Sequence, residues 1–321
     1  MNDTVTATQQ DLAALVEGAR NGRVRAIARL ISLVENNSPS LRPLMGLMAG
    51  DTGRAHVIGL TGSPGVGKST TTTAIIGAYR ARGMRVGVLA VDPSSPFSGG
   101  AVLGDRIRMQ RHSLDEGVYI RSMASRGHLG GLSTAAPQAL RVFDVAGFDV
   151  VLVETVGVGQ SEVEIASTAD TTLVLLAPGM GDGVQAAKAG ILEIGDVFVV
   201  NKADRDGAQN LIREIRNMVA LDSHGADDWK PPIVRTVASQ EEGIEDLVDR
   251  IEAHREFQQA GGQWAARRLT RARSEIEALA LATVRREFHT GGREGLEDLA
   301  AAVRDGRLDP YSAADQLLNR S

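Results

Sequence analysis

Residues 56–69 read HVIGLTGSPGVGKS, and this stretch decides the fold. The apolar run HVIGL leads into a glycine-rich turn that fits the pattern G-x-x-x-x-G-K-[ST] from Gly62 to Ser69. A strand that passes through such a turn into a helix is the setting in which this pattern binds phosphate, because glycines let backbone amides approach the phosphate oxygens. We therefore expect a phosphate-binding loop, or P-loop, after the first strand of an α/β domain.

The residue types of this loop indicate its contacts. Lys68 is placed to reach the β- and γ-phosphates of a nucleotide, and the Ser69 hydroxyl is placed to bind Mg²⁺. The predicted phosphate-binding residues are Gly62, Ser63, Pro64, Gly65, Val66, Gly67, Lys68, Ser69 and Thr70.

A second motif, N-K-x-D, follows the apolar run DVFVVN and indicates which base is bound. The Asp204 carboxylate can accept two hydrogen bonds from guanine, whereas adenine has no donor at those positions. A site built on such bonds discriminates by roughly 10⁴-fold. The turn after the run PIVRTVA resembles a further base-binding loop, and a plain strand-to-helix connection is the alternative. The predicted base-binding residues are Asn201, Lys202, Asp204, Val237, Ala238 and Ser239.

Acidic residues near the predicted sheet edge are candidates for the metal. Asp92 and Glu154 each end an apolar run, and carboxylates there lie at the carboxyl edge of an open α/β sheet, where ligands bind. Asp105 lies in a glycine-rich loop that we expect to be the first switch. Together with Ser69, these residues form the predicted Mg²⁺ set, and a role as acidic helix caps is the alternative for each acid.

The segment that starts at Glu154 fills the place of the D-x-x-G motif, with Glu instead of Asp. Gly157 could offer its N–H to the γ-phosphate. In Ras-type enzymes a glutamine directly after this glycine orients the attacking water, but here that place holds Val158, and Gln160 lies two residues further on. The predicted catalytic residues are Lys68, Glu154, Gly157 and Gln160. We expect slow hydrolysis unless a partner supplies a polar group.

Texture along the chain divides it into three predicted parts. Residues 1–53 have apolar residues at helical spacing. In 54–257, apolar runs alternate with helical segments, which indicates a mainly parallel sheet with helices on both faces. The predicted strands fall within 56–60, 85–92, 149–154, 171–178, 196–201 and 232–238. The fold class is therefore α/β, a P-loop NTPase G domain with helical additions at both ends.

The part 258–321 returns to a helical pattern. Its apolar residues Ala265, Leu269, Ala272, Ile276 and Leu279 fall at spacings of four and three, and the series ends at the polar Thr283. An ordinary helix packed on its own domain and a dimerisation arm are both compatible with so short a seam. Its arginines alternate with this seam and favour a solvated helix face over nucleic-acid binding; they are Arg267, Arg268, Arg271, Arg273, Arg285 and Arg286.

Composition excludes several classes of protein. The formal net charge of −5 gives no bulk attraction to nucleic acid or anionic lipid. The absence of cysteine excludes disulfides and thiolate metal sites. The polar N-terminus lacks the layout of a secretion signal, and no apolar run approaches the roughly 18 residues of a membrane span. We expect a cytoplasmic protein with neither a membrane nor a nucleic-acid partner.

Long phrases of the chain resemble the methylmalonyl-CoA mutase-associated GTPases of the MeaB/ArgK type, within the SIMIBI class of P-loop GTPases. The resemblance runs from about residue 20 to the end. Besides the P-loop, it is carried by DPSSPFSGGAVLGDRIRM (92–109), SRGHLGGL (125–132), ETVGVGQSE (154–162) and APGMGDGVQAAKAGILEIGDVFVVNKAD (177–204).

The resemblance implies a homodimer with a C-terminal dimerisation arm and an adenosylcobalamin-dependent mutase, methylmalonyl-CoA mutase or a relative, as partner. It implies a chaperone that uses GTP, GDP and Mg²⁺ to gate cofactor loading and to protect the mutase from inactivation. The family's switch III matches residues about 178–188, which makes Asp182, Gln185 and Lys188 candidates for relaying the nucleotide state. Gly183 replaces an acid that is common in relatives and puts details of that relay in question.

Rival functions make different demands on the sequence. A metallochaperone-type GTPase calls for Cys/His clusters, but the histidines show no ligand spacing; they are His56, His112, His128, His224, His254 and His289. A signal-recognition factor should carry a Met-rich domain, and the eight methionines here are scattered. A nucleotide-binding protein of an amino-acid transport system is a further alternative.

Overall fold

The computed structural model describes residues 8–92, 110–112, 114–124, 135–155, 167–179, 192–221, 225, 228–290 and 293–318. The chain divides into two compact units, Met1–Arg267 and Arg268–Ser321. Among the described helices, none combines the length and the apolar character that crossing a bilayer requires.

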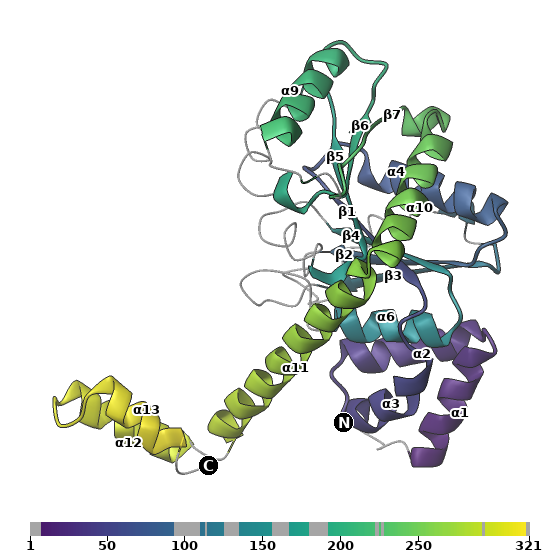
Figure 1. Ribbon diagram of the computed structural model, residues 1–321. Coiled ribbons are helices and arrows are strands. Elements are labelled where there is room, and N and C mark those ends of the chain that lie inside the picture. Colours follow the sequence, from purple (N-terminus) through teal and green to yellow (C-terminus); the bar gives the residue numbers. More distant parts are fainter. Residues whose placement is uncertain are drawn as a thin grey trace. The chain divides into compact units, whose positions relative to one another are not determined.

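The first unit is built on a parallel sheet of seven described strands in the order β3-β2-β4-β1-β5-β6-β7 (Figure 1). The strands are β1 (His56–Thr61), β2 (Val86–Asp92), β3 (Val118–Ala124), β4 (Val150–Thr155), β5 (Thr171–Leu176), β6 (Val197–Asn201) and β7 (Ile233–Thr236). Every residue of β1, β4, β5 and β6 is buried, as expected of parallel strands covered by helices on both faces. The predicted α/β class is confirmed.

Strand β3 is the element that the sequence pattern did not predict. It lies at the edge of the sheet beside β2, with Val118 opposite Val86. Its sequence, VYIRSMA, is interrupted by polar residues, and Arg121 donates to a carboxylate oxygen of Glu35 over 2.7 Å. A half-buried edge strand has no continuous apolar run, so a search for fully covered strands passes over it.

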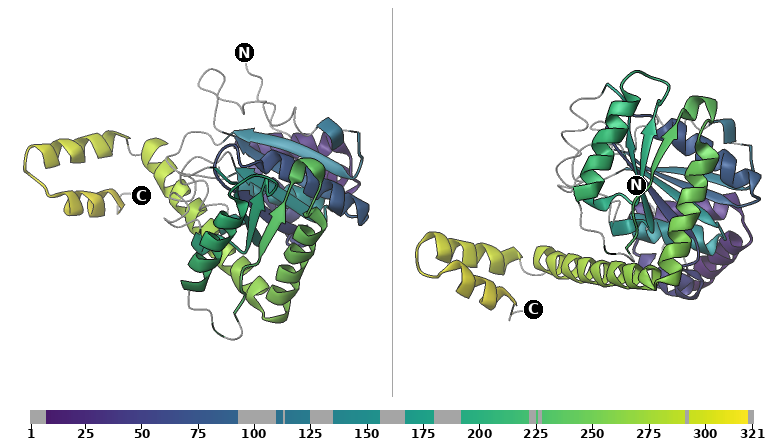
Figure 2. Two further views of the ribbon diagram at one scale, coloured as in Figure 1. Left: turned by 90° about the horizontal axis from the view of Figure 1, so that it is seen from above. Right: turned by 45° about the horizontal axis from the view of Figure 1, so that its top comes forward.

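Helices α4 (Lys68–Ala81) and α10 (Ile244–Ala260) lie side by side on one face of the sheet, and Figure 2 shows this layer from two further directions. Their apolar side chains form one buried cluster with those of the strands, among them Ile75, Ile76, Tyr79, Leu152, Leu173 and Leu247. This packing holds the first turn of α4, and therefore the loop before it, against β1.

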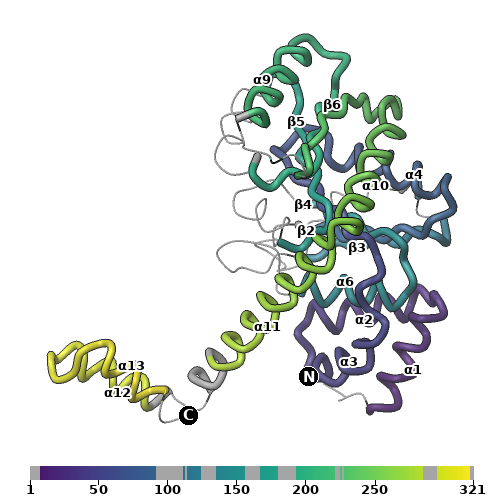
Figure 3. The backbone as a smooth tube through the Cα atoms, viewed as in Figure 1, coloured from purple at the N-terminus to yellow at the C-terminus, as the bar shows by residue number. Residues whose placement is uncertain are grey.

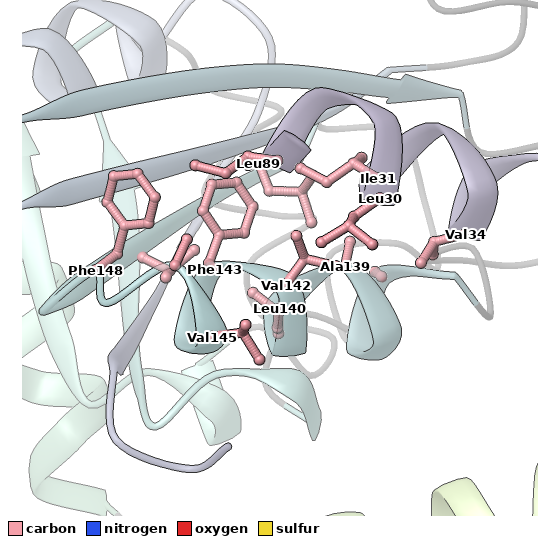
Figure 4. Close-up of a cluster of buried hydrophobic side chains, with 14 of the residues drawn as sticks. Leu30, Ile31, Val34, Leu89, Ala139, Leu140, Val142, Phe143, Val145 and Phe148 are labelled. Carbon is pink, nitrogen blue, oxygen red and sulfur yellow. The ribbon is translucent and has the colours of Figure 1, made fainter. Parts of the chain in front are cut away.

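The other face carries α6 (Ala136–Val145) over β2 and β4 and α9 (Ala208–Leu221) over β5 and β6. The predicted N-terminal helices are α1 (Gln9–Arg20), α2 (Val24–Glu35) and α3 (Leu41–Met48), and they lie beside α6 (Figure 3). Figure 4 shows Leu30 and Ile31 of α2 directed toward Ala139 and Val142 of α6. The N-terminal helices thus share a hydrophobic core with the sheet.

A buried polar network occupies the amino-terminal edge of the sheet, away from the phosphate loop. His56 Nε2 contacts Thr171 Oγ1 at 2.8 Å, and the same hydroxyl contacts His254 Nδ1 at 2.9 Å. His254 Nε2 lies 3.2 Å from Asp196 Oδ1, and Arg267 lies 2.9 Å from the same oxygen. Burial lowers the pKa of His56. Burial also acts to raise the pKa of Asp196, but His254 and Arg267 outweigh it and hold that pKa below its usual range.

Helix α11 (Gln263–Thr290) begins in the first unit and continues into the second, which also holds α12 (Arg293–Arg304) and α13 (Pro310–Leu318) packed against each other. The apolar seam of α11 is exposed in the single chain: Leu269, Ile276 and Leu279 are 55%, 68% and 45% exposed.

Candidate functional site

The phosphate loop connects the end of β1 to the start of α4, as predicted, and its glycines adopt a left-handed backbone. Gly62 has a φ of 142° and Gly67 a φ of 100°. A Cβ on Gly62 would lie 2.3 Å from Leu175 O, and a Cβ on Gly67 would lie 2.4 Å from Asn201 Nδ2. Only glycine satisfies both the backbone angle and the space at these positions. The loop therefore curls at the N-terminus of α4, where helix amides and the helix dipole favour an anion.

Lys68 is the first residue of α4 and is 8% exposed. Its ammonium donates to Gly62 O at 2.6 Å and to Ser63 O at 3.3 Å, so its charge lies directly over the loop. A cation held in partly buried surroundings attracts an anion more strongly than one in open water. The role of Lys68 as a phosphate contact stays a prediction, and this position is compatible with it.

The next residue, Ser69, meets the predicted acid at the end of β4. Its hydroxyl donates to Glu154 Oε1 over 2.7 Å, and the two residues are 7% and 4% exposed. A hydroxyl beside a carboxylate is the set of hard oxygen atoms that Mg²⁺ prefers, and this ion commonly takes one or two protein ligands and completes its shell with phosphate and water. Ser69 and Glu154 therefore fit the Mg²⁺ that the sequence predicts.

Of the two other predicted metal residues, the structure gives only the backbone position of Asp92 and does not describe Asp105. Asp92 ends β2, whose Ala90 is in register with Glu154, so Asp92 belongs to the same edge of the sheet. Asp105 lies outside the described residues. Within the described part of the chain, no group of three or more His, Asp or Glu residues could hold an ion without further ligands.

Two of the predicted base-binding residues, Asn201 and Lys202, contact the phosphate loop directly. Asn201 is 3% exposed, and its Nδ2 donates to Val66 O at 2.8 Å. Its Oδ1 accepts from Ala238 N at 3.1 Å and from Thr236 Oγ1 at 3.2 Å. Asn201 thus ties the end of β6 to the P-loop and to the turn after β7. No local sequence signal indicated these bonds, because the partners lie far away along the chain.

Lys202 and Asp204 complete this corner. Lys202 has a φ of 55°, and its ammonium donates to Gly65 O over 2.6 Å. Asp204, two residues further along the chain, is exposed. The structure therefore brings the N-K-x-D motif and the P-loop together, in an arrangement that could place a base beside Asp204 while phosphates lie at the start of α4.

The turn predicted as a further base loop begins at Val237 and forms a short 3-10 helix at Ala238–Gln240. The Ala238 amide is engaged inside the protein, where it donates to Asn201. Ser239, exposed in the same turn, is the member of the predicted set on the solvent side. The turn is held on the far side by Glu242, whose carbonyl accepts from Val237 N at 3.1 Å.

One site residue was not predicted. Thr72 is fully buried on α4, one turn after Ser69, and its hydroxyl lies 3.0 Å from Glu154 Oε2. Its signal in the sequence was the three-residue spacing from Ser69, which places both hydroxyls on one helix face.

Several predicted residues fall outside the part of the chain that the structure describes. These are Asp105 of the first switch, Gly157 and Gln160 after β4, and Asp182, Gln185 and Lys188 of the third switch. Their roles stay predictions.

Comparison with known proteins places the chain among GTP-binding proteins. The model of the family described as "Methylmalonyl Co-A mutase-associated GTPase MeaB" matches residues 27–292. A Pyrococcus horikoshii protein that carries a GTPase designation is 46% identical, over 97% of this chain and 98% of its own. The mouse protein named "Methylmalonic aciduria type A homolog, mitochondrial" is 38% identical, over 81% of this chain and 64% of its own. A crystal structure described as an LAO/AO transport system kinase aligns with a TM-score of 0.72 at 26% identity, covering 98% of both chains.

Proposed function

Since this chain belongs to the methylmalonyl-CoA mutase-associated GTPase family MeaB, we propose that it is a GTP-hydrolysing switch that regulates an adenosylcobalamin-dependent mutase. Relatives over nearly the whole chain are named as GTPases, which supports GTP hydrolysis at the general level. The finer claims, namely the client, the slow rate and the way the switch operates, are proposals.

The observation that carries the guanine-nucleotide site is the position of Asn201. Through one side chain, at 2.8 Å from Val66 O and 3.1 Å from Ala238 N, it joins the loop that suits phosphate to the corner that holds Asp204. A nucleotide has both a phosphate end and a base end, and a site that binds both needs these loops in fixed relation. The discrimination then falls to Asp204, whose carboxylate matches two donors of guanine.

The residues around the scissile phosphate divide the work of hydrolysis. Lys68 supplies positive charge over the loop, and the amides at the start of α4 face the same region. Mg²⁺, held by Ser69 with Glu154 behind it, would offset the charge that develops on the phosphate oxygens. Val158 stands where Ras-type enzymes have the glutamine that orients the attacking water, and its apolar side chain cannot do so. This supports slow turnover, hastened when a partner supplies a polar group.

The proposed client rests on the family and its relatives. The family description names methylmalonyl-CoA mutase, and the printed name of the mouse relative refers to methylmalonic aciduria. GTP and GDP can control a partner only if the two forms of this protein bind it differently. We propose that this difference gates loading of adenosylcobalamin and protects the mutase from inactivation, with Asp182, Gln185 and Lys188 relaying the nucleotide state.

We also propose a homodimer formed by the C-terminal part, 258–321. The exposed Leu269, Ile276 and Leu279 of α11 support it, because apolar residues at spacings of seven and three give a stripe that a second helix can cover. Light scattering on the purified chain and on an Ile276→Glu variant tests it, since the dimer predicts that the charge yields monomers.

Titration calorimetry with GDP, GTP, ATP and xanthosine triphosphate tests the nucleotide assignment. The wild type should prefer GTP to ATP by roughly 10⁴-fold. Asp204→Asn should weaken GTP by on the order of 10²-fold and improve xanthosine triphosphate, because an amide donates where the carboxylate accepts. Equal affinity for GTP and ATP would remove the proposal. A pull-down of the mutase with GDP or a non-hydrolysable GTP analogue then tests the client.

A further inference from the structure

The carboxylate of Glu154 is gripped at both oxygens by hydroxyls of one helix. Ser69 Oγ lies 2.7 Å from Oε1, and Thr72 Oγ1 lies 3.0 Å from Oε2. The two hydroxyls are three residues apart on α4, so they stand on the same helix face. Thr72 has no exposed surface, and Glu154 is 4% exposed, so the contact lies inside the protein.

The hydroxyl proton of Thr72 has a choice of acceptor. Thr72 Oγ1 is 3.0 Å from Glu154 Oε2 and also 3.0 Å from Lys68 O. In an α-helix the carbonyl of Lys68 already accepts the backbone N–H four residues later, which is that of Thr72 itself. A carboxylate accepts a stronger, charge-assisted hydrogen bond than an amide carbonyl does. The proton of Thr72 therefore points to Glu154.

A second anchor matters here because of the residue type at position 154. Glutamate has one more rotatable bond than the aspartate that usually fills this place, so its carboxylate has more positions to choose from. With Oε2 fixed by Thr72, Oε1 stays in line with the hydroxyl of Ser69. The proton of Ser69 is then drawn toward Glu154, which leaves the lone pairs of this hydroxyl available to a cation.

We propose that Thr72 is a positioning residue for the divalent cation: it fixes Glu154, which orients Ser69 as a metal ligand. This inference rests on the proposed function, since it assigns a role at the same nucleotide site. In this proposal Thr72 acts through Glu154 alone, because among the described residues its hydroxyl contacts only Glu154 Oε2 and Lys68 O. Loss of the Thr72 hydroxyl should therefore reduce the nucleotide affinity measured with Mg²⁺. It should not change the affinity measured without Mg²⁺.

Thr72→Val tests this role with little change of shape, because valine keeps the branched Cβ and replaces only the hydroxyl. Thr72→Ser keeps the hydroxyl and removes the methyl group. Thr73→Val is the matched control: the Thr73 hydroxyl donates to Ser69 O over 2.9 Å, so it is a neighbouring threonine on the same helix that bonds the backbone instead of Glu154. Thermal melting of the three variants shows whether each is folded.

The measurement is GDP affinity by calorimetry, in EDTA and across a Mg²⁺ titration. The result is expressed as the affinity in Mg²⁺ divided by the affinity in EDTA. Thr72→Val should lower that ratio on the order of tenfold, while affinity in EDTA stays near that of the wild type. Thr72→Ser and Thr73→Val should each keep the wild-type ratio within about threefold.

Two results would overturn the inference: Thr72→Val with the wild-type ratio, or Thr72→Ser impaired as much as Thr72→Val. Should Thr72→Val melt far below the wild type, Thr72→Ala, judged by the same ratio, replaces it. Failure of the proposed function looks different, because the wild type itself would then bind GDP weakly or without response to Mg²⁺, and both proposals would fall together.

Discussion

Replacing Asn201 by aspartate would test the link between the two halves of the site. The change is close to isosteric and keeps an acceptor for Ala238 N at 3.1 Å, but it removes the donor that reaches Val66 O at 2.8 Å. Leaving that buried carbonyl unpaired costs about 1–3 kcal/mol. A carboxylate oxygen placed against the carbonyl adds repulsion, so we take about 2–4 kcal/mol in all. That range corresponds to roughly 30- to 800-fold in an equilibrium constant.

This cost should appear mainly in binding. A loop without ligand can relax away from the carboxylate, whereas the bound loop has to keep its shape around the phosphates. Calorimetry with GDP in Mg²⁺ measures the effect, and Asn217→Asp, the same chemical change on the exposed side of α9, is the control. If Asn201→Asp bound GDP within about threefold of the control, the reasoning from the Val66 contact would be refuted.

Two further predictions concern other parts of the first unit. Gly67→Ala, whose new Cβ would lie 2.4 Å from Asn201 Nδ2, should weaken GDP binding at least about tenfold by calorimetry. In contrast, a Cβ at Gly46 in helix α3 meets nothing within 4 Å, so Gly46→Ala should keep the wild-type GDP affinity and raise the melting temperature. Burial lowers the pKa of His56 by more than the nearby Glu252 raises it. Below about pH 6.5, His56 is therefore protonated in the unfolded chain while it stays neutral in the folded chain. The free energy of unfolding should therefore decrease as the pH drops from about 6.5 to about 5.5. Urea unfolding should show a smaller decrease for His56→Asn than for the wild type. An equal decrease would contradict the assignment of this pH dependence to His56.

The parts of the site that sequence predicted are those encoded over short spans. The P-loop pattern specifies a turn, a cation and a hydroxyl within eight consecutive residues, from Gly62 to Ser69, so its position before α4 follows from the sequence alone. The N-K-x-D motif is equally local. What each motif contacts is a different matter: the bond from Asn201 to Val66 O spans 135 residues and depends on the order in which the strands are arranged.

Side-chain contacts between segments far apart in the sequence were unpredictable for the same reason. His56 and His254 show no ligand spacing along the chain, yet the hydroxyl of Thr171 lies between them at 2.8 and 2.9 Å. Thr171 starts β5, and its Ile58 partner shows that β5 runs beside β1. A hydrophobicity pattern reports that these positions are buried, but it does not report which polar groups meet there.

The dual use of Asn201 has a consequence for how such a site can change. One oxygen accepts from Ala238 N and the nitrogen donates to Val66 O, so the turn after β7 and the P-loop share a single buried amide. A buried amide that is hydrogen-bonded at both its oxygen and its nitrogen is held in place, because a shift leaves a polar atom unpaired. A substitution that moves the base-side turn must therefore disturb the phosphate side as well. Base preference and phosphate affinity should therefore be coupled. In a double-mutant cycle, the effects of Ser239→Gly and Gly65→Ala on the free energy of nucleotide binding should be non-additive, whereas effects at distant sites with no shared partner usually add.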